Sequence, residues 1–297
     1  MTTPHAGRRR TPVPWPVVSR EAGRQCWVQV SRSAPVRCQR LRESDAVTDG
    51  RQLAGDREPH DHGGDVPFFK AVLLDWVGTL IVPKWGPART GPRGASWIRH
   101  SLRRLGRDSS EAEVQRVSAA LSAAGKLPHV VRGWAGADLS AAAHRDSYDR
   151  WIDAAGADSV LAEEMYTALS DAAGNAFAAD VPPTLAAFKA AGLKVAIVSD
   201  IHVDIRPAFL ERGLDVYVDE FVLSFEHGVS KPDPAIFRVA LSRLGVRPEE
   251  ALMVGDRSSH DGAAVEAGIP TLLVPPLTTV TEERLHLALA ACGIPAR

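Results

Sequence analysis

Four polar side chains stand where short apolar runs of the chain end. They are Asp75 after FFKAVLL, Ser199 in KVAIVSD, Lys231 in GVSKPDP and Asp256 after ALMVG. Two carboxylates brought together could share a hard divalent cation such as Mg2+, which prefers oxygen ligands. A lysine close to Asp75 would keep that carboxylate ionised at neutral pH, and a serine hydroxyl could donate to a phosphoryl oxygen. The residue types therefore indicate metal-assisted chemistry on a phosphoryl group.

Three further residues follow these positions closely. Gly78 and Thr79 come soon after the first aspartate, and they allow a tight turn whose backbone amides can point at an anion. Asp261, in GDRSSHD, could cap the helix expected after it. Each of these residue types alone is common in turns, helix caps or solvated surface. Their order along the chain is what favours a site.

Strands and helices alternate in the second half of the chain. The segments KVAIVSD, EFVLSF, ALMVGD and PTLLV read as strands. A helix over about 182–191 starts with two prolines and ends at a glycine, and Asp233-Pro234 opens another. This alternation predicts an α/β fold, a doubly wound, Rossmann-like parallel sheet with right-handed crossovers. Because the carboxyl ends of parallel strands share one edge, the polar residues should meet there.

A block of roughly 100 residues separates the first strand from the others. Its pattern is helical over 83–181, with Trp97 and Leu102 near one helix face, and no strand signal interrupts it. We expect 67–82 and 182–297 to form one core. The block should form an all-helical cap over the carboxyl edge of the sheet.

Residues 1–66 differ from the rest in composition. The first 65 residues contain eleven arginines, eight acidic residues, and no lysine, phenylalanine or isoleucine. No period of 3.6 or 2 persists there, so the segment cannot bury enough apolar surface to offset its ordering entropy. We predict a disordered, arginine-rich tail that the fold does not need. The motif HDH near residue 60 reads as a solvated loop rather than a metal site.

The whole-chain composition excludes several classes of partner. The formal net charge of the 297 residues is −1, which gives no positive field for nucleic acid or anionic lipid. No apolar run approaches the roughly 18 residues of a membrane span. Cys26, Cys38 and Cys292 have neither disulfide-framework nor zinc spacing. We expect a cytoplasmic protein, monomeric or homodimeric, that acts on a small molecule.

The motifs resemble those of a known family. The pattern DxxGT after the first strand, a serine after a later strand, SKPDP before a helix, and GDxxxxD before GAAVEAG look like the four motifs of the haloacid dehalogenase superfamily. The resemblance covers about residues 68–275. It implies that Asp75 is a nucleophile that forms a covalent aspartyl intermediate. It also implies that Ser199 binds the transferred phosphoryl group, and that Lys231 steadies Asp75 and neutralises the substrate.

The same resemblance implies a metal site and a cap. Asp256 resembles a magnesium ligand, alongside Asp75 and the backbone carbonyl of Val77. Asp261 resembles the acidic residue that orients the metal or its water. The helical block resembles the family's first type of cap, which closes over small substrates and selects them.

One position departs from the family's phosphatase pattern. Phosphatases of the superfamily have aspartate two residues after the nucleophile, where it protonates the leaving oxygen and then activates water, and here that residue is Val77. Valine can do neither, although its backbone carbonyl is unaffected. General acid–base catalysis is typically worth about 10² to 10⁴ in rate.

Three interpretations follow from this departure. In the first, the protein still hydrolyses a small phosphorylated metabolite, using a good leaving group or another acid. In the second, it hydrolyses a carbon–halogen or carbon–phosphorus bond, since those branches also lack the second aspartate. In the third, it is a weak or inactive member that binds a phosphorylated ligand or a protein partner. In the first interpretation, a cap residue could supply the proton: His100, His129, His144 or Asp138. Each of these is also typical of an ordinary cap surface.

Two observations weigh against the second interpretation. Asp256 belongs to the sequence GD at a motif where the dehalogenases have a sequence that resembles SSN and need no metal. Phosphonate cleavage needs a lysine that forms a Schiff base, and the cap offers only Lys84 and Lys126. A receiver domain also uses aspartate, serine or threonine, and lysine, but it needs neither the inserted block nor GDxxxxD. Four residues near the expected mouth of the active site could bind an anion or a ring: Arg89, Arg93, Trp85 and Trp97. Surface arginines and core tryptophans are, however, the commoner roles of these residue types.

Overall fold

A computed structural model describes residues 68–85 and 92–295. The predictions for residues 1–66, for Cys26 and Cys38, and for Arg89 lie outside the described residues. Within the described ranges, no helix is long and apolar enough to cross a membrane.

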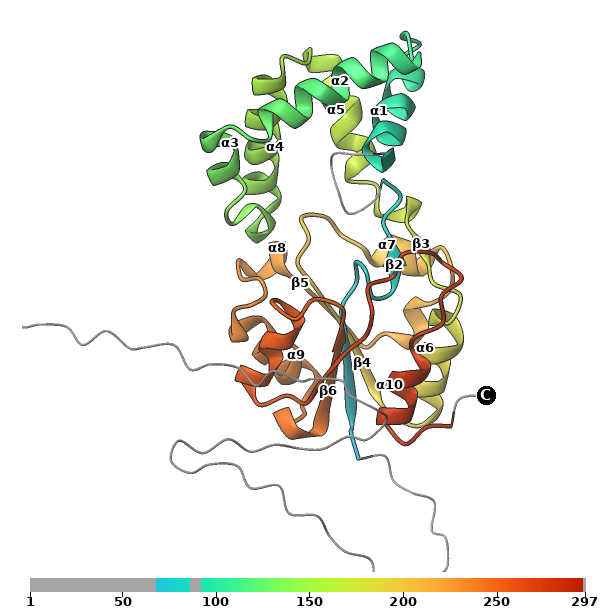
Figure 1. Cartoon of the computed structure of the whole chain (residues 1–297). Helices are drawn as coiled ribbons and strands as arrows, with labels where there is room; N and C mark the ends of the chain where they lie inside the picture. The colour runs from blue at the N-terminus through green and yellow to red at the C-terminus, as the bar shows by residue number, and fades with distance from the viewer. Residues whose placement is uncertain (1–67, 86–91, 296–297) are drawn as a thin grey trace, which may run out of the picture. The chain divides into compact units, whose positions relative to one another are not determined.

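A five-stranded parallel sheet forms the centre of the core, in the order β5-β4-β1-β6-β7 (Figure 1). Strand β1 lies in the middle because its four residues are buried and apolar. The strand order reverses around β1, so the predicted doubly wound parallel sheet is confirmed. The strands are β1 (Ala71–Leu74), β4 (Lys194–Ser199), β5 (Glu220–Leu223), β6 (Ala251–Gly255) and β7 (Thr271–Leu273).

Helices cover both faces of the sheet, and the strand alternation decides which side chain faces which layer. Val72 and Leu74 belong to one apolar cluster, with α6 (Val181–Ala190) and α10 (His286–Ala291). Ala71 and Leu73 belong to the other cluster. The helix on that second face is α9 (Pro234–Leu244), and Figure 1 shows it on the opposite side of the strands from α6 and α10.

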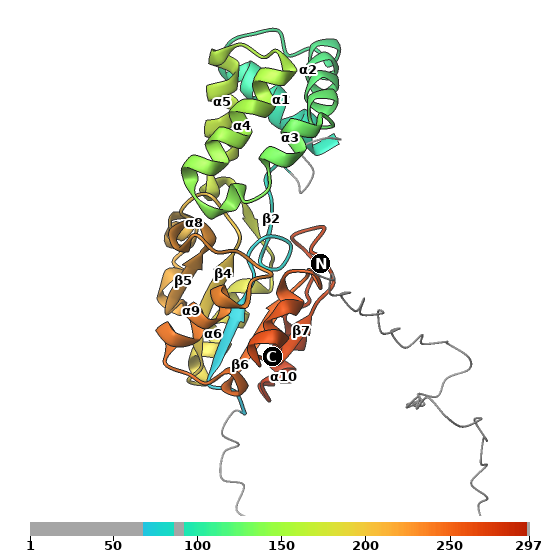
Figure 2. The same cartoon turned by 90° about the vertical axis from the view of Figure 1, so that its left-hand side faces the viewer.

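The block after the first strand is a helical insert, which we define as the segment from α1 to α5 (Figure 2). It has its own apolar core, in which Trp97, Tyr148 and Trp151 are buried. Its elements are α1 (Pro92–Arg104), α2 (Glu111–Ala124), α3 (Pro128–Gly133), η1 (Ala137–Leu139), α4 (Ala141–Ala155) and α5 (Ser159–Leu169).

The prediction that no strand interrupts residues 83–181 is wrong in one detail. The two-residue strand β3 (Ala176–Phe177) pairs antiparallel with β2 (Ile81–Val82). A pair of this length has no sequence period to detect. The pairing connects the segment that leads from the sheet into the insert with the segment that leads back from the insert to the sheet.

Local sequence explains where the remaining helices begin and end. Asp233 caps α9 as predicted, because its side chain accepts from the amide of Ala235, and Gly245 ends that helix in a left-handed conformation. Two expectations differ in detail. The expected strand EFVLSF ends at Leu223, and the segment DGAAVEA is a 3-10 helix rather than an α-helix. The short elements are η2 (Ala172–Gly174), α7 (Arg206–Leu210), η3 (Asp215–Tyr217), α8 (Ser224–His227), η4 (Pro248–Glu250) and η5 (Asp261–Ala267).

Candidate active site at the carboxyl edge of the sheet

Three neighbouring strands bring the predicted residues to one edge. Asp75 follows β1, Ser199 ends β4 and Asp256 follows β6, and these strands are adjacent. The amide of Asp75 donates to the carbonyl of Val254 at 2.9 Å, which continues the β1–β6 ladder to the edge. The convergence expected from the sequence is therefore present in the structure.

Lys231 lies at the centre of the site. Its Nζ donates to Asp75 Oδ1 at 2.5 Å, to Asp261 Oδ1 at 2.6 Å and to the carbonyl oxygen of Val198 at 3.3 Å. The three donors of the ammonium thus have three acceptors. Lys231 is 4% exposed, Asp75 5% and Asp261 0%, so water screens this group of charges little.

Burial and charge act against each other on these groups. Burial raises the pKa of Asp75, and the charge of Lys231 opposes that rise. Burial alone would lower the pKa of Lys231, but the charges of Asp75 and Asp261 outweigh it and hold that pKa above its ordinary value. The lysine therefore stays charged and keeps a cation beside the buried carboxylate.

Three carboxylates form a cluster at the edge. Oxygens of Asp75, Asp256 and Asp261 lie within 4.8 Å of one another. With Lys231 charged, the fully ionised cluster carries a net charge of −2. Burial first, and then the charges of Asp75 and Asp261, raise the pKa of Asp256 to about 6. The oxygen donors and the excess negative charge both fit a hard divalent cation such as Mg2+.

The turn after Asp75 needs a glycine. Gly78 has a φ of +87°, and a Cβ there would lie 2.6 Å from Asp256 Oδ2. Its amide, however, donates to the carbonyl of Ile81 at 3.1 Å. The expectation that this amide points at an anion is therefore wrong, because the turn uses it internally.

Thr79 ties the carboxylates together. Its hydroxyl donates to Asp75 Oδ2 at 3.0 Å and lies 3.4 Å from Asp256 Oδ1. It is fully buried. The two oxygens of Asp75 thus have separate partners, Lys231 on Oδ1 and Thr79 on Oδ2, and these fix the plane of the carboxylate. The side chain of Val77, by contrast, packs against the apolar cluster on the α6 face of the sheet.

Asp261 and Asp200 hold the loops of the site. Asp261 Oδ2 accepts from the amide of Arg257 at 2.8 Å, so this aspartate closes the loop before η5 rather than capping the helix, and it also contacts Lys231. Asp200 Oδ1 accepts from the amide of Lys231 at 2.8 Å. Burial raises the pKa of Asp200, although the charge of Lys231 opposes that rise. Ser199, which precedes it, is buried at the end of β4.

The sequence gives no sign of one buried residue that braces the turn. Arg284 Nη1 donates to the carbonyl of Gly78 at 3.1 Å and also contacts the carbonyl of Pro275, while Nη2 donates to the carbonyl of Thr79 at 2.5 Å. Asp180 Oδ2 holds this segment by accepting from the amides of Arg284 and Leu285. An arginine in the polar run TEERLH carries no motif, so only the fold reveals its contacts.

The insert residues considered as proton donors separate into two groups. The ring of His100 lies 5.0 Å from that of Trp85, and His129 is exposed on α3. His144, in contrast, is 2% exposed, so its expected place on the cap surface is wrong. Asp138, His144 and the core residue His202 form a cluster whose oxygen and nitrogen ligand atoms lie within 4.8 Å of one another. Sequence reasoning missed His202.

The residues near the expected mouth contribute structure rather than a visible binding site. Trp97 is buried and donates to the carbonyl of Met165, and Trp85 donates to that of Ala168. The side chain of Arg93 lies outside the described residues. Lys84 pairs with Asp171 at 3.4 Å.

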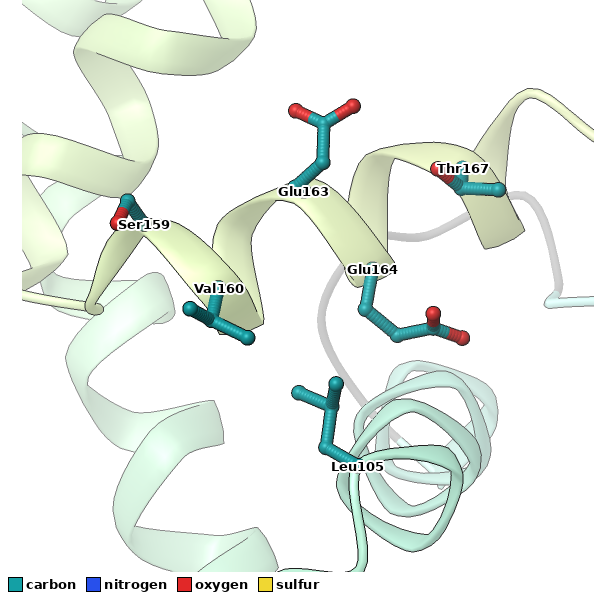
Figure 3. Close-up of a pocket in the computed structure, with 6 residues that line it drawn as sticks. All are labelled: Leu105, Ser159, Val160, Glu163, Glu164 and Thr167. Carbon is teal, nitrogen blue, oxygen red and sulfur yellow. The ribbon is translucent and has the colours of Figure 1, made fainter.

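A hollow of about 380 Å3 lies on the insert, where Leu105 and Val160 point toward one another (Figure 3). Its two carboxylates pair with arginines of the insert: Glu163 with Arg145 at 2.8 Å and Glu164 with Arg104 at 3.3 Å. None of the predicted site residues lines it. The lining residues are Leu105, Ser159, Val160, Glu163, Glu164 and Thr167.

Comparison with known proteins identifies the family of the chain. A family model described as haloacid dehalogenase-like hydrolase matches residues 69–268. The chain belongs to this family of hydrolases. The four motifs, the parallel sheet and the insert all lie within or beside the matched range.

Two curated relatives match part of the chain. A glyceraldehyde 3-phosphate phosphatase of Methanopyrus kandleri is 41% identical over 97 residues, which is 32% of this chain and 42% of that protein. A ribulose-1,5-bisphosphate 5-phosphatase of Halopiger xanaduensis is 39% identical over 99 residues, 33% of this chain and 41% of that protein. The match thus spans less than half of these relatives. A solved structure, a HAD phosphatase of Thermococcus onnurineus, is 25% identical with a TM-score of 0.45, over 69% of this chain and 86% of that chain.

Proposed function

We propose that the protein is a Mg2+-dependent phosphatase that cleaves a small phosphate monoester through an aspartyl intermediate on Asp75. The observation that carries this proposal is the buried Asp75 carboxylate, whose two oxygens are held by Lys231 and Thr79 beside two further carboxylates. A carboxylate fixed in this way is a preorganised nucleophile. The partial relatives are phosphatases of small phosphorylated metabolites, which supports the same substrate class.

The reaction divides into two displacements. Asp75 forms a bond to phosphorus as the ester oxygen leaves, and water then cleaves the aspartyl phosphate to release inorganic phosphate and restore the carboxylate. Lys231 keeps a positive charge beside the transferring group throughout, since its neighbours hold its pKa high. Ser199, which ends β4, would donate to a phosphoryl oxygen.

The carboxylate cluster supplies the metal ligands in this proposal. Asp75, Asp256 and the backbone carbonyl of Val77 would hold Mg2+, with Asp261 as a further ligand or an orienting group. A bound Mg2+ supplies charge stabilisation to the transferring phosphoryl group. The chain itself provides the hard oxygen donors and the excess negative charge that the ion requires.

The helical insert would act as the cap, and residues 83–181 remain our proposal for its extent. It contacts the core beside the site, because Ser224 Oγ donates to the carbonyl of Asp138 at 2.6 Å. The proposed substrate is a small molecule rather than nucleic acid or membrane. A cytoplasmic monomer or homodimer suits that substrate.

Other reactions of the superfamily fit the site less well. Asp256 lies in a carboxylate cluster, which a metal-free dehalogenase does not need. The Lys84 ammonium is paired with Asp171, and Lys126 is exposed, so neither is buried as a Schiff-base lysine requires.

Turnover of p-nitrophenyl phosphate with and without Mg2+ tests the proposal, followed by a screen of phosphorylated metabolites. We expect Mg2+-dependent release of phosphate that Asp75→Asn abolishes, while the variant stays folded. The same activity in Asp75→Asn would show that another group is the nucleophile. Phosphate binding without turnover in the wild-type protein would favour a ligand-binding protein instead.

A further inference from the structure

The proposed phosphatase lacks a proton donor for the leaving oxygen at its usual place. Val77 packs against apolar side chains and cannot transfer a proton. An alkoxide leaves poorly unless it is protonated in the transition state, and such proton transfer is worth about 10² to 10⁴ in rate. Another titratable group must therefore face the leaving group if alkyl phosphates are substrates.

Two histidines meet where the insert contacts the loop beyond β4. The rings of His144 and His202 are stacked face to face, with centroids 3.3 Å apart and planes within 1°. His144 comes from α4 of the insert and is buried, whereas His202 belongs to the core and is half-buried. The hydroxyl of Tyr166 lies 3.4 Å from His144 Nδ1, and that of Ser170 lies 3.4 Å from His202 Nε2. Both rings are thus held in place.

The pair is tied to the catalytic edge by short contacts. His202 lies three residues after Ser199. The amide of Ile201 donates to Ser224 Oγ at 2.9 Å, and that hydroxyl in turn donates to the carbonyl of Asp138 in the insert. Asp200, two residues before His202, accepts from the amide of Lys231. The leaving group of a phosphate bound near Ser199 would emerge between this loop and the insert.

Charge limits how many protons the pair can hold. Two imidazolium ions stacked in contact would repel each other, so at most one of the two rings is protonated to imidazolium at a time. One carboxylate oxygen of Asp138 lies within 4.8 Å of one nitrogen of each ring, so its negative charge stabilises that one positive charge. A pair with one imidazolium can give up its extra proton and take it back, which is what a two-step hydrolysis needs.

We propose, on the basis of the phosphatase function above, that His202 is the proton donor and acceptor of the reaction, with His144 and Asp138 as its positioning residues. His202 is assigned the transfer because it is half-buried and follows the motif that carries Ser199. His144, which stacks on it, is only 2% exposed.

The proton balances over the two steps. As Asp75 bonds to phosphorus, the phosphorus–ester oxygen bond breaks, and that oxygen takes the proton of the His202 imidazolium and leaves as an alcohol. The neutral pair then takes a proton from water as the water oxygen attacks phosphorus. The phosphorus–Asp75 bond breaks, and inorganic phosphate, the Asp75 carboxylate and the imidazolium result.

The same three side chains offer donors that suit a transition-metal ion. The stacking argues against that use. An imidazole nitrogen binds a metal in the plane of its ring, and an ion shared by two parallel rings in contact would lie outside both planes. The geometry therefore favours proton transfer, and metal content becomes an outcome of the test.

The test compares a good and a poor leaving group in matched variants. Mg2+-dependent kcat and KM are measured with p-nitrophenyl phosphate, and with phosphoglycolate and glycerol 3-phosphate as alkyl phosphates. The variants are His202→Gln, His144→Gln, Asp200→Asn as the competing acid, and His129→Gln as a control on the exposed face of the insert. Thermal melts establish that each variant is folded, and metal analysis of each purified protein is made in parallel.

We expect His202→Gln to lower kcat for the alkyl phosphates about 10²-fold with KM little changed, and to leave aryl turnover within about threefold. His144→Gln should lower the alkyl-to-aryl ratio about tenfold, a change that simple loss of stability would not produce. His129→Gln should match the wild-type protein.

Several results would overturn the proposal. Alkyl turnover retained in folded His202→Gln, or lost selectively only in Asp200→Asn, would place the donor elsewhere. Wild-type protein that cleaves the aryl but neither alkyl phosphate would have no working donor. A stoichiometric transition metal that His202→Gln loses would make the cluster a metal site. Absence of any Mg2+-dependent turnover in the wild-type protein would instead refute the phosphatase function on which the inference rests.

Discussion

At the scale of single residues, the carboxylate cluster decides how the site responds to pH and metal. The pKa of Asp256 is raised to about 6 by burial and by its acidic neighbours, so the folded metal-free protein is penalised for ionising it. The penalty is full above a pH of about 6 and is relieved as pH falls below that value, toward the ordinary aspartate range. Mg2+ should remove the same penalty by neutralising the cluster.

Asp256→Asn should therefore have opposite effects with and without metal. In EDTA at pH 7.5 the variant should melt higher than the wild-type protein, and the difference should shrink toward pH 5. With Mg2+ only the wild-type protein should gain stability. Thermal melts across pH measure both effects, with Asp153→Asn on the exposed face of α4 as a control. Equal Mg2+ stabilisation of both proteins would show that Asp256 is not a ligand.

Val77 provides a second test at this scale. If His202 supplies the proton, a carboxyl group at position 77 should restore the family's own donor when His202 is absent. We expect Val77→Asp in the His202→Gln background to raise alkyl phosphate turnover by about 10², and Val77→Asn in the same background to give no gain. Equal rates for the two double variants would mean that a group at position 77 does not reach the leaving oxygen.

At the scale of elements, the C-terminal segment braces the turn after β1. Arg284 lies beyond the range matched by the family model, yet its guanidinium spans the carbonyls of Gly78 and Thr79. That turn also contains the Val77 carbonyl proposed as a metal ligand. The planar fork of an arginine donates to carbonyls from separate nitrogens in a fixed geometry, which the compact ammonium of a lysine does not reproduce.

Arg284→Lys should therefore weaken Mg2+ binding as well as stability. Leaving buried carbonyls without donors costs about 1–3 kcal/mol, and the loosened turn should lower Mg2+ affinity several-fold in calorimetric titration. Arg243→Lys, on the half-exposed salt bridge with Glu220, is the matched control. Unchanged Mg2+ affinity in a folded Arg284→Lys protein would confine the residue to a structural role.

The elements also explain what the sequence could and could not predict. Asp75, Ser199 and Asp256 follow apolar strands, and parallel neighbours must end at one edge, so their convergence was predictable. The contacts of Arg284 and His202 were not, because they depend on how a C-terminal segment and the insert pack against loops distant in sequence. The internal use of the Gly78 amide depends on turn geometry rather than residue type.

At the scale of the whole molecule, we expect the first 66 residues to be dispensable. Their composition motivates this prediction, and the family match begins only at residue 69. A protein that starts at residue 67 should melt within a few degrees of the full chain and retain its kcat. Insolubility, or a much lower melting temperature of the shortened protein, would show that the segment contributes to the fold.

The central claim is that Asp75 carries the phosphoryl group during turnover. Acid quenching during turnover, followed by borohydride reduction and peptide mass spectrometry, tests it directly, because reduction converts an aspartyl phosphate to homoserine. We predict homoserine at position 75 in the wild-type protein with Mg2+ and substrate. No homoserine should form without substrate or in the Asp75→Asn variant. Steady turnover with position 75 unmodified, or modification of another carboxylate, would contradict the aspartyl mechanism.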